Sequence, residues 1–244
     1  MNARERILGR LRSAAPSAAD VSIDELDRRI DAHYAGHYAM QPQSMQQRIE
    51  ALQTALTAAH ADVWCADIAS WPAQLAARLA ADGVRRLLLD TATPEGAALA
   101  AALPPDVDAR TYAQPIERWK AELFDTIDAG FTVARSGIAS TGTLILAPDA
   151  GTPRTVSLAP PLHVALVHAH TLHADLHAAA RAERWRDGMP TNLVLVSGPS
   201  KTSDIQQTLA YGAHGPRKVW VVIVTGAADA DPDADKTTNE GAAR

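Results

Sequence analysis

Short apolar segments alternate with helix-like segments from about residue 61 onward, and this alternation restricts the fold more than any other feature. Apolar runs at 63–65 and 87–89 flank a segment with helical spacing at 70–81, and another helical pattern follows at 94–102. A strand, a helix and a strand in succession form the βαβ unit, in which the two strands lie parallel. We therefore expect an α/β protein whose mixed, mostly parallel, Rossmann-like sheet is flanked by helices.

The later part of this region predicts more strands than helices. Its end predicts a strand at 193–196, a loop, a helix from about Thr202 to Tyr211 that Gly212 would end, and a last strand at 219–224. Further strands are expected near 107–112 and at 131–133, 143–146, 155–158 and 164–167, with helices at 116–124 and 174–185.

The first 60 residues show helical spacing but no strand pattern. Apolar residues such as Ile7 and Leu11 predict a short amphipathic helix, a second helix is expected to end near Ile30, and a longer one covers about 43–59. The division that follows is a helical N-terminal arm at 1–44, an α/β domain at 45–225 and a disordered acidic tail at 226–244.

Composition excludes several classes of protein. Hydrophobic residues make up 47% and charged residues 21%, which is typical of a globular chain, and the net charge of −5 without a basic block argues against nucleic-acid binding. No apolar run approaches the roughly 20 residues that cross a bilayer, and residues 1–12 lack the apolar core of a signal peptide. We expect a soluble, cytoplasmic protein. Because Cys65 is the only cysteine and an iron–sulfur cluster usually takes about four, this chain is not expected to hold a cluster or another cofactor alone.

The loop after the predicted strand at 193–196 carries a strong local signal for a ligand. It combines a glycine, several hydroxyls and a lysine ahead of a predicted helix, a pattern that suits a phosphate or a carboxylate. The alternative is simple capping of that helix, with Lys201 in solvent. The candidate ligand-binding residues here are Ser197, Gly198, Ser200, Lys201, Thr202 and Asp204.

Two further loops and a group of histidines are weaker candidates. The loop at 135–143 contains two glycines and four hydroxyl residues, which indicates either backbone open to a ligand or an ordinary hairpin. His214 is a candidate acid or base in a turn that also holds Gly215. The histidines suggest a metal site, but no carboxylate or cysteine pattern completes a motif, so no metal is assigned; they are His163, His168, His170, His173 and His177.

Four segments, taken together, resemble the lactate utilisation protein C family, whose members contain the LUD domain. The segments are 136–144, 159–164, 197–205 and 212–216, and they occur in the family's order within residues 45–224. The resemblance implies a fold like that of CoA transferases and sugar-phosphate isomerases. It also implies a role in oxidising L-lactate to pyruvate with partner proteins that carry iron–sulfur clusters.

The resemblance also has departures and leaves alternatives. The family usually has an acidic residue where this chain has Ser140, so covalent CoA-transferase chemistry there is doubtful, whereas Arg154 is kept and could bind a carboxylate. The alternatives to a lactate-oxidising subunit are an independent CoA-transferase-like or isomerase-like enzyme, and a non-catalytic scaffold or regulator. The remaining candidates are Gly137, Thr141, Gly142 and Thr143 for ligand binding, and His163 with His214 for catalysis. We expect the loops at 141–143 and 197–202 to meet in one pocket at the carboxyl edge of the sheet.

Overall fold

The computed structural model describes residues 3–14, 22–37, 44–203 and 209–226. The chain divides into two compact units, Met1–Gln41 and Pro42–Arg244. The expected acidic tail at 226–244 lies almost wholly outside the described residues. Within those residues, no helix is long and apolar enough to cross a membrane.

The first unit contains helices α1 (Ala3–Ala14) and α2 (Ile23–His37). The Ser22 hydroxyl accepts a hydrogen bond from the backbone N–H of Glu25 and so caps α2. The prediction that this helix ends near Ile30 was wrong, because it continues for two more turns.

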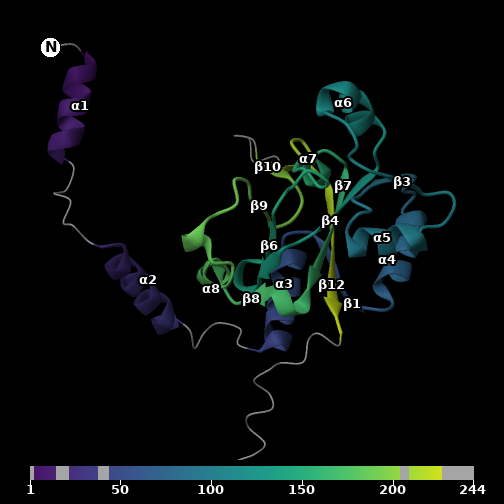
Figure 1. Ribbon diagram of the computed structural model, residues 1–244, viewed down its shortest axis with the longest axis horizontal. Helices are drawn as coiled ribbons and strands as arrows, with labels where there is room; N and C mark the ends of the chain where they lie inside the picture. The colour runs from purple at the N-terminus through teal and green to yellow at the C-terminus, as the bar shows by residue number, and fades with distance from the viewer. Residues whose placement is uncertain (1–2, 15–21, 38–43, 204–208, 227–244) are drawn as a thin grey trace, which may run out of the picture. The chain divides into compact units, whose positions relative to one another are not determined.

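Six strands form the central sheet of the second unit, and all of them run parallel (Figure 1). Their order across the sheet is β1-β12-β7-β4-β2-β3, so the first and last strands of the unit are neighbours. The strands are β1 (Asp62–Asp67), β2 (Arg86–Leu88), β3 (Asp108–Arg110), β4 (Ala129–Val133), β7 (Leu162–His168) and β12 (Lys218–Thr225). This sheet confirms the α/β prediction.

A smaller sheet lies beside the central one and holds β9, which the sequence pattern had placed at the start of a final βαβ unit. The order is β8-β5-β6-β9, with β6 antiparallel to both of its neighbours. Its strands are β5 (Ser136–Ile138), β6 (Thr143–Leu146), β8 (Leu172–His173) and β9 (Val194–Val196), and short 3₁₀ turns η2 (Ala139–Thr141) and η3 (Ala169–Thr171) lead into β6 and β8.

Side-chain caps begin two of the helices of the second unit. In α3 (Met45–Ala58), Ser44 and Gln47 form a reciprocal capping box, and Thr93 caps α5 (Pro94–Ala102). The others are α4 (Trp71–Ala81), α6 (Ile116–Asp125), α8 (Leu176–Ala182) and the 3₁₀ turn η4 (Trp185–Asp187).

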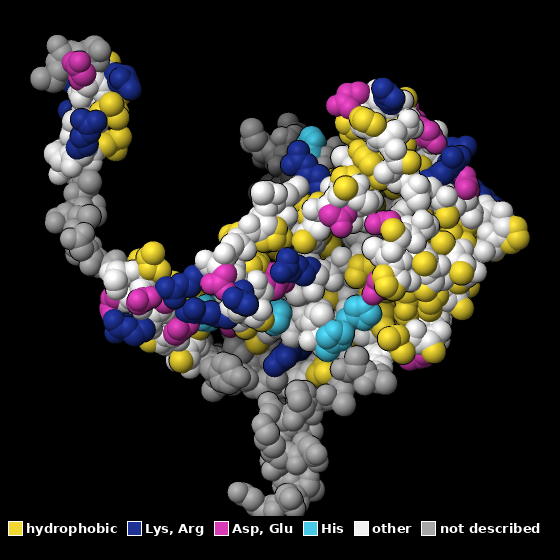
Figure 2. Space-filling model, viewed as in Figure 1, with side chains coloured by type: hydrophobic (Ala, Val, Ile, Leu, Met, Phe, Trp, Pro, Cys, Tyr) yellow, Lys and Arg dark blue, Asp and Glu magenta, His cyan; other side chains and the backbone are white. Residues whose placement is uncertain are grey.

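Alternate residues of the central strands enter two different cores. Trp220, Val222 and Val224 of β12 pack with α4 and α5, whereas the side chains between them, Val221 and Ile223, pack with α3 and the smaller sheet. The outer surface of α4 and α5 is rich in small hydrophobic side chains (Figure 2). The central sheet is thus covered by helices on one face and by α3 with the second sheet on the other.

Two predicted elements differ in type. A helix was expected at 202–211. The described residues at the two ends of this segment instead form strands β10 (Lys201–Ser203) and β11 (Leu209–Tyr211), which pair antiparallel as a hairpin. Backbone bonds from Ser200 N–H to the Pro216 carbonyl and from Gly212 N–H to the Ser200 carbonyl hold this hairpin in place. The expected strand at 155–158 is the short helix α7 (Thr155–Leu158), whose Val156 carbonyl lies so close to Gly130 that no side chain fits there.

Candidate functional site

A cavity of about 190 Å³ opens between the two sheets at the amino-terminal end of β7 and β12. Its walls come from three parts of the chain that are distant in sequence: α7, the start of the central strands, and β9 with the loops that follow. Apolar and polar side chains both contribute. The lining residues include Ser157, Leu158, His163, Leu195, Ser197, Ser200, His214 and Gly215.

His163 is the most deeply buried polar residue of this cavity. Its side chain is fully buried, and its Nε2 atom lies 2.8 Å from the hydroxyl oxygen of Thr132 on the neighbouring strand β4. Burial lowers the pKa of His163 to about 4, so the imidazole is neutral at pH 7. The second residue of β7 is therefore an uncharged hydrogen-bonding group.

The other ring nitrogen of His163 has no hydrogen-bond partner among the described residues. A buried polar atom left unpaired costs roughly 1–3 kcal/mol, so such atoms are rare in native structures. A neutral imidazole has one donor and one acceptor nitrogen. Whichever way the bond to Thr132 runs, Nδ1 is left with one unused hydrogen-bonding function.

Hydroxyl groups connect two of the sequence motifs, as expected. Thr143 Oγ1 lies 2.8 Å from Thr141 Oγ1 and 2.8 Å from Ser197 Oγ. Thr143 is buried at the start of β6, while Ser197 follows β9 and reaches the rim of the cavity. The loops at 141–143 and 197–202 do meet through this row of hydroxyls, but only the second loop lines the cavity, so the prediction of one shared pocket was wrong for residues 141–143.

The glycines of these motifs serve packing. Gly142 has a φ of +61°, and a side chain there would lie 2.7 Å from the Cβ atom of Ala55 in α3. Gly198 has a φ of +124°, and a side chain there would lie 2.9 Å from the carbonyl oxygen of Ala59, the residue that follows the same helix. Gly137 is packed against Leu172, and Gly215 approaches Ser200. In the loop at 135–143, Gly137 and Gly142 thus favour the interpretation of an ordinary structural connection.

The position of the cavity corrects one prediction. The motifs were expected at the carboxyl edge of the parallel sheet, but His163 and Val219 are the second residues of β7 and β12, which places the cavity at the amino edge. The reason is that β9 belongs to the second sheet. Its carboxyl end therefore faces the amino ends of the central strands.

Several candidates in the neighbouring segments lie elsewhere. Lys201 is exposed in β10, so the predicted helix N-terminus that would have presented it to an anion is not formed. Thr202 is half-buried in the same strand, and Asp204 lies outside the described residues. Arg154 lines a separate hollow of about 20 Å³. Thr132 and Ser157 line that hollow too. Ser140, at the family's acidic position, is exposed.

The histidines of the 163–177 segment are spread over different elements. His168, at the carboxyl end of β7, forms a 2.9 Å contact between its Nε2 atom and Oε1 of Glu95. Burial lowers the pKa of His173 in β8. Across the described ranges, no three histidine, cysteine or acidic side chains gather as metal ligands.

The sequence interpretation missed Thr132, Ser157 and the two leucines at the rim. Thr132 had a usable signal, since it is a hydroxyl residue inside the apolar run at 131–133. Leu158 and Leu195 are 41% and 52% exposed, and they give the cavity an apolar lip. Nothing in the local sequence separates them from core leucines.

A family model described as the LUD domain matches residues 49–224, which covers nearly the whole second unit. The chain belongs to the LUD-domain family. An uncharacterized protein of Neisseria meningitidis serogroup B is 35% identical over 227 residues, which cover 92% of this chain and 94% of that protein.

Other relatives of this LUD-domain protein match over a shorter segment. Lactate utilization protein C of Shouchella clausii is 35% identical over 106 residues, and the protein of the same name from an Exiguobacterium strain is 35% identical over 107. Each match covers 42% of this chain and 46% of the relative, so the chain spans about half the length of these proteins.

A solved structure supports the fold. The crystal structure of a DUF162 family protein from Deinococcus radiodurans aligns with a TM-score of 0.55 at 24% sequence identity. The alignment covers 75% of this chain and all of that one. The LUD-domain fold described above is therefore shared with that protein.

Proposed function

We propose that this LUD-domain protein is a subunit of an L-lactate oxidation system that acts with iron–sulfur partner proteins, and that it binds the small carboxylate. Two findings support the proposal: the relationship to lactate utilization protein C, and a cavity that offers a neutral imidazole, hydroxyls and an apolar lip. The unpartnered Nδ1 atom of buried His163 is the observation that carries it.

The chemistry requires a division of labour between proteins. Oxidation of lactate to pyruvate breaks the C2–H and the hydroxyl O–H bonds and releases two electrons and two protons. One cysteine does not fit an iron–sulfur cluster, which usually takes about four thiolates, so the electrons would pass to clusters on the partner proteins. This chain then binds and orients the substrate.

The cavity offers a matching group for each part of a 2-hydroxy carboxylate. His163 Nδ1 would bond the C2 hydroxyl, and Thr132 would fix the ring in one orientation. His214 and Ser200 would donate hydrogen bonds to the carboxylate, and the lip formed by Leu158 and Leu195 would contact the methyl group. Such a site discriminates by losing a buried hydrogen bond when the hydroxyl is missing.

The test is a titration of L-lactate into the isolated protein, followed by reconstitution with the candidate iron–sulfur proteins and a dye that accepts electrons. His163→Gln should weaken L-lactate binding about tenfold or more, because a hydrogen bond to a buried group is lost. Propionate, which lacks the hydroxyl, should bind wild type and His163→Gln equally. Dye reduction should require this subunit.

His173→Gln is the matched control, since His173 is another histidine whose pKa is lowered by burial but lies outside the cavity. It should leave L-lactate affinity unchanged. Equal weakening by both substitutions, or full dye reduction by the iron–sulfur proteins without this chain, would contradict the proposal.

A further inference from the structure

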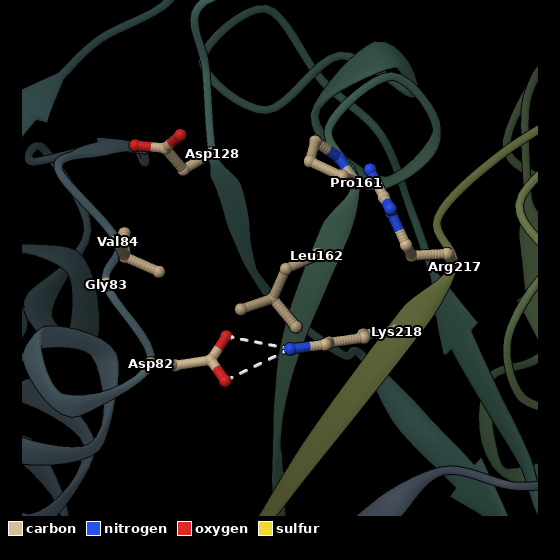
Figure 3. A pocket seen from close by; sticks show the side chains of 8 residues that line it. All are labelled: Asp82, Gly83, Val84, Asp128, Pro161, Leu162, Arg217 and Lys218. Carbon is tan, nitrogen blue, oxygen red and sulfur yellow. Dashed lines mark hydrogen bonds and ion pairs between the residues drawn. The ribbon is translucent and has the colours of Figure 1, made fainter.

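A larger cavity, of about 450 Å³, continues along the same amino edge of the sheet. It shares Gly215 with the His163 cavity, and it shares Pro161, Asp128 and Arg217 with a third hollow of about 220 Å³ (Figure 3). Pockets that hold small organic ligands span roughly 300–1,000 Å³. This cavity of about 450 Å³ is therefore large enough for a ligand much bigger than lactate.

Two aromatic side chains line this cavity and remain exposed. Phe124 of α6 is 50% exposed and Tyr211 of β11 is 40% exposed. Large aromatic side chains are usually well buried, and a flat ring that lines a cavity is a surface for stacking. The Tyr211 ring meets His60 edge to face at 5.4 Å, and this contact supports the tyrosine from the α3 side.

A cation stands beside the aromatic rings without an ion-pair partner in the described part of the chain. In Figure 3, Lys218 extends to Asp82, 3.0 Å away, whereas the Arg217 side chain extends toward Pro161. The backbone N–H of Arg217 bonds the Pro161 carbonyl at 3.0 Å, which fixes the base of the side chain. Arg217 is thus positioned to bind an anion in the cavity.

The backbone brings the tyrosine and the arginine together. Gly212 has a φ of +79°, and a side chain on it would lie 2.6 Å from the Cβ atom of Arg217. Only glycine allows the chain leaving β11 to pass so close to Arg217. The turn therefore holds the residue after Tyr211 against the base of the Arg217 side chain, and both Tyr211 and Arg217 line the cavity.

The carboxylates of the cavity restrict the ligand further. Oδ2 of Asp128 already accepts hydrogen bonds of 2.8 Å from the backbone N–H groups of Arg85 and Arg86. Asp125 lines the same cavity at the end of α6. In dinucleotide-binding folds a carboxylate binds a ribose hydroxyl, and Asp125 offers the same group here.

We propose that this second cavity binds a mononucleotide, with its base against Phe124 and Tyr211, its sugar hydroxyls at Asp125 and its phosphate at Arg217. The proposal rests on this cavity alone and does not depend on lactate binding. AMP and flavin mononucleotide are the two probes. Each carries a phosphate, and the aromatic ring is an adenine base in the first and a flavin ring in the second.

The test is calorimetric titration of AMP and flavin mononucleotide into the full chain, compared with adenosine, riboflavin and inorganic phosphate. At least one nucleotide should bind, its nucleoside should bind about tenfold or more weakly, and phosphate alone should bind more weakly still. Failure of both nucleotides to bind at millimolar concentration would overturn the proposal. Binding of phosphate as tight as that of the nucleotides would overturn it too.

Variants separate the phosphate contact from the stacking contact. Arg217→Gln should lower nucleotide affinity about tenfold to a hundredfold and leave nucleoside affinity unchanged, whereas Tyr211→Leu and Phe124→Leu should weaken both. Arg118→Gln removes the same charge from α6 outside the cavity and should change neither. Equal losses in Arg217→Gln and Arg118→Gln would reduce the effect to general charge attraction and refute the site.

One further variant keeps the two proposals distinguishable. His163→Gln alters the neighbouring cavity only, so it should bind the nucleotide as wild type does, even if L-lactate binding fails in every form of the protein. Loss of nucleotide binding in a His163→Gln protein with an unchanged unfolding midpoint would contradict two separate sites.

Discussion

The two faces of the central sheet bury different kinds of side chain. The face under α4 and α5 packs a core of hydrophobic residues, such as Leu75, Leu99 and Phe131. The opposite face carries Thr132 and His163 among its apolar residues. Within the described ranges, the buried polar side chains belong to that face, to α7 or to the smaller sheet; they are Thr132, Ser136, Thr143, Ser157 and His163.

This difference separates what the fold needs from what a site needs. Hydrophobic burial stabilises either face equally well, whereas a buried polar group costs free energy unless it is fully hydrogen-bonded. His163 has only one of its two nitrogens paired. The helix-covered face is therefore a structural core, and the other face contains the candidate site.

The largest expected effect comes from the structural face. Leu75→Ala in α4 removes a fully buried side chain and should lower the free energy of unfolding by about 2–5 kcal/mol. The pH dependence of stability should not change, because the side chains that pack around Leu75 in this core are hydrophobic and do not titrate. Urea denaturation at several pH values measures both. A loss below 1 kcal/mol would contradict the description of the helix-covered face as the structural core.

The polar face should make stability depend on pH. The pKa of His163 is about 4 in the folded chain and near 6.5 when unfolded, so between these values the unfolded chain binds more protons. Stability should be constant above pH 6.5 and fall by about 3 kcal/mol as the pH drops to 4.

Two variants test whether His163 causes this loss of stability at low pH. His163→Gln should remove most of it, and His173→Gln should remove only a small part, since burial lowers the pKa of that half-buried histidine too. Denaturant unfolding at pH 7.0 and 4.5 distinguishes the two. An unchanged fall in His163→Gln would show that His163 is not the neutral buried group described here.

A smaller difference is expected between two glycines with positive φ. Gly83→Ala places a side chain in open space and should cost only the backbone strain, about 1 kcal/mol. Gly142→Ala also meets Ala55 and the backbone of Leu56, and it should cost roughly 2–3 kcal/mol. Thermal or urea unfolding gives both values. Equal costs would indicate that the loop at 141–143 is not held against α3.

The smallest effect is expected at Lys201, which is exposed on β10. Lys201→Ala should change the free energy of unfolding by less than about 0.5 kcal/mol and the L-lactate affinity by less than twofold. The titration used for His163→Gln measures it. A tenfold loss would restore Lys201 to the binding site and would extend the polar site beyond the cavity described.

Local pattern predicted most elements correctly where a single periodicity dominated. The helices at 45–58, 71–81 and 94–102 and the strand at 218–225 lie close to their expected positions. The prediction was wrong at 201–211, where hydroxyl residues before an apolar segment suggested a capped helix but both described ends pair as strands. Pairing with another strand overrides weak local preference there.

The candidate site, too, could be predicted from the sequence only where it did not depend on which strands become neighbours. The motifs that contain Ser197, His163 and His214 pointed to residues that do line one cavity. The sequence could not indicate that β9 lies in a different sheet from β12, and so the expected edge was wrong. Thr132 was missed because its role depends on a partner 31 residues away in the chain.

The sequence by itself determined that the chain is an α/β protein of the LUD-domain family, because apolar periodicity and motif order are local properties that are visible without contacts. Only the tertiary structure decided which polar residues are buried together. Burial and pairing depend on which strands become neighbours, and that arrangement makes the second residue of β7 a neutral histidine with one nitrogen bonded to β4 and the other unpaired.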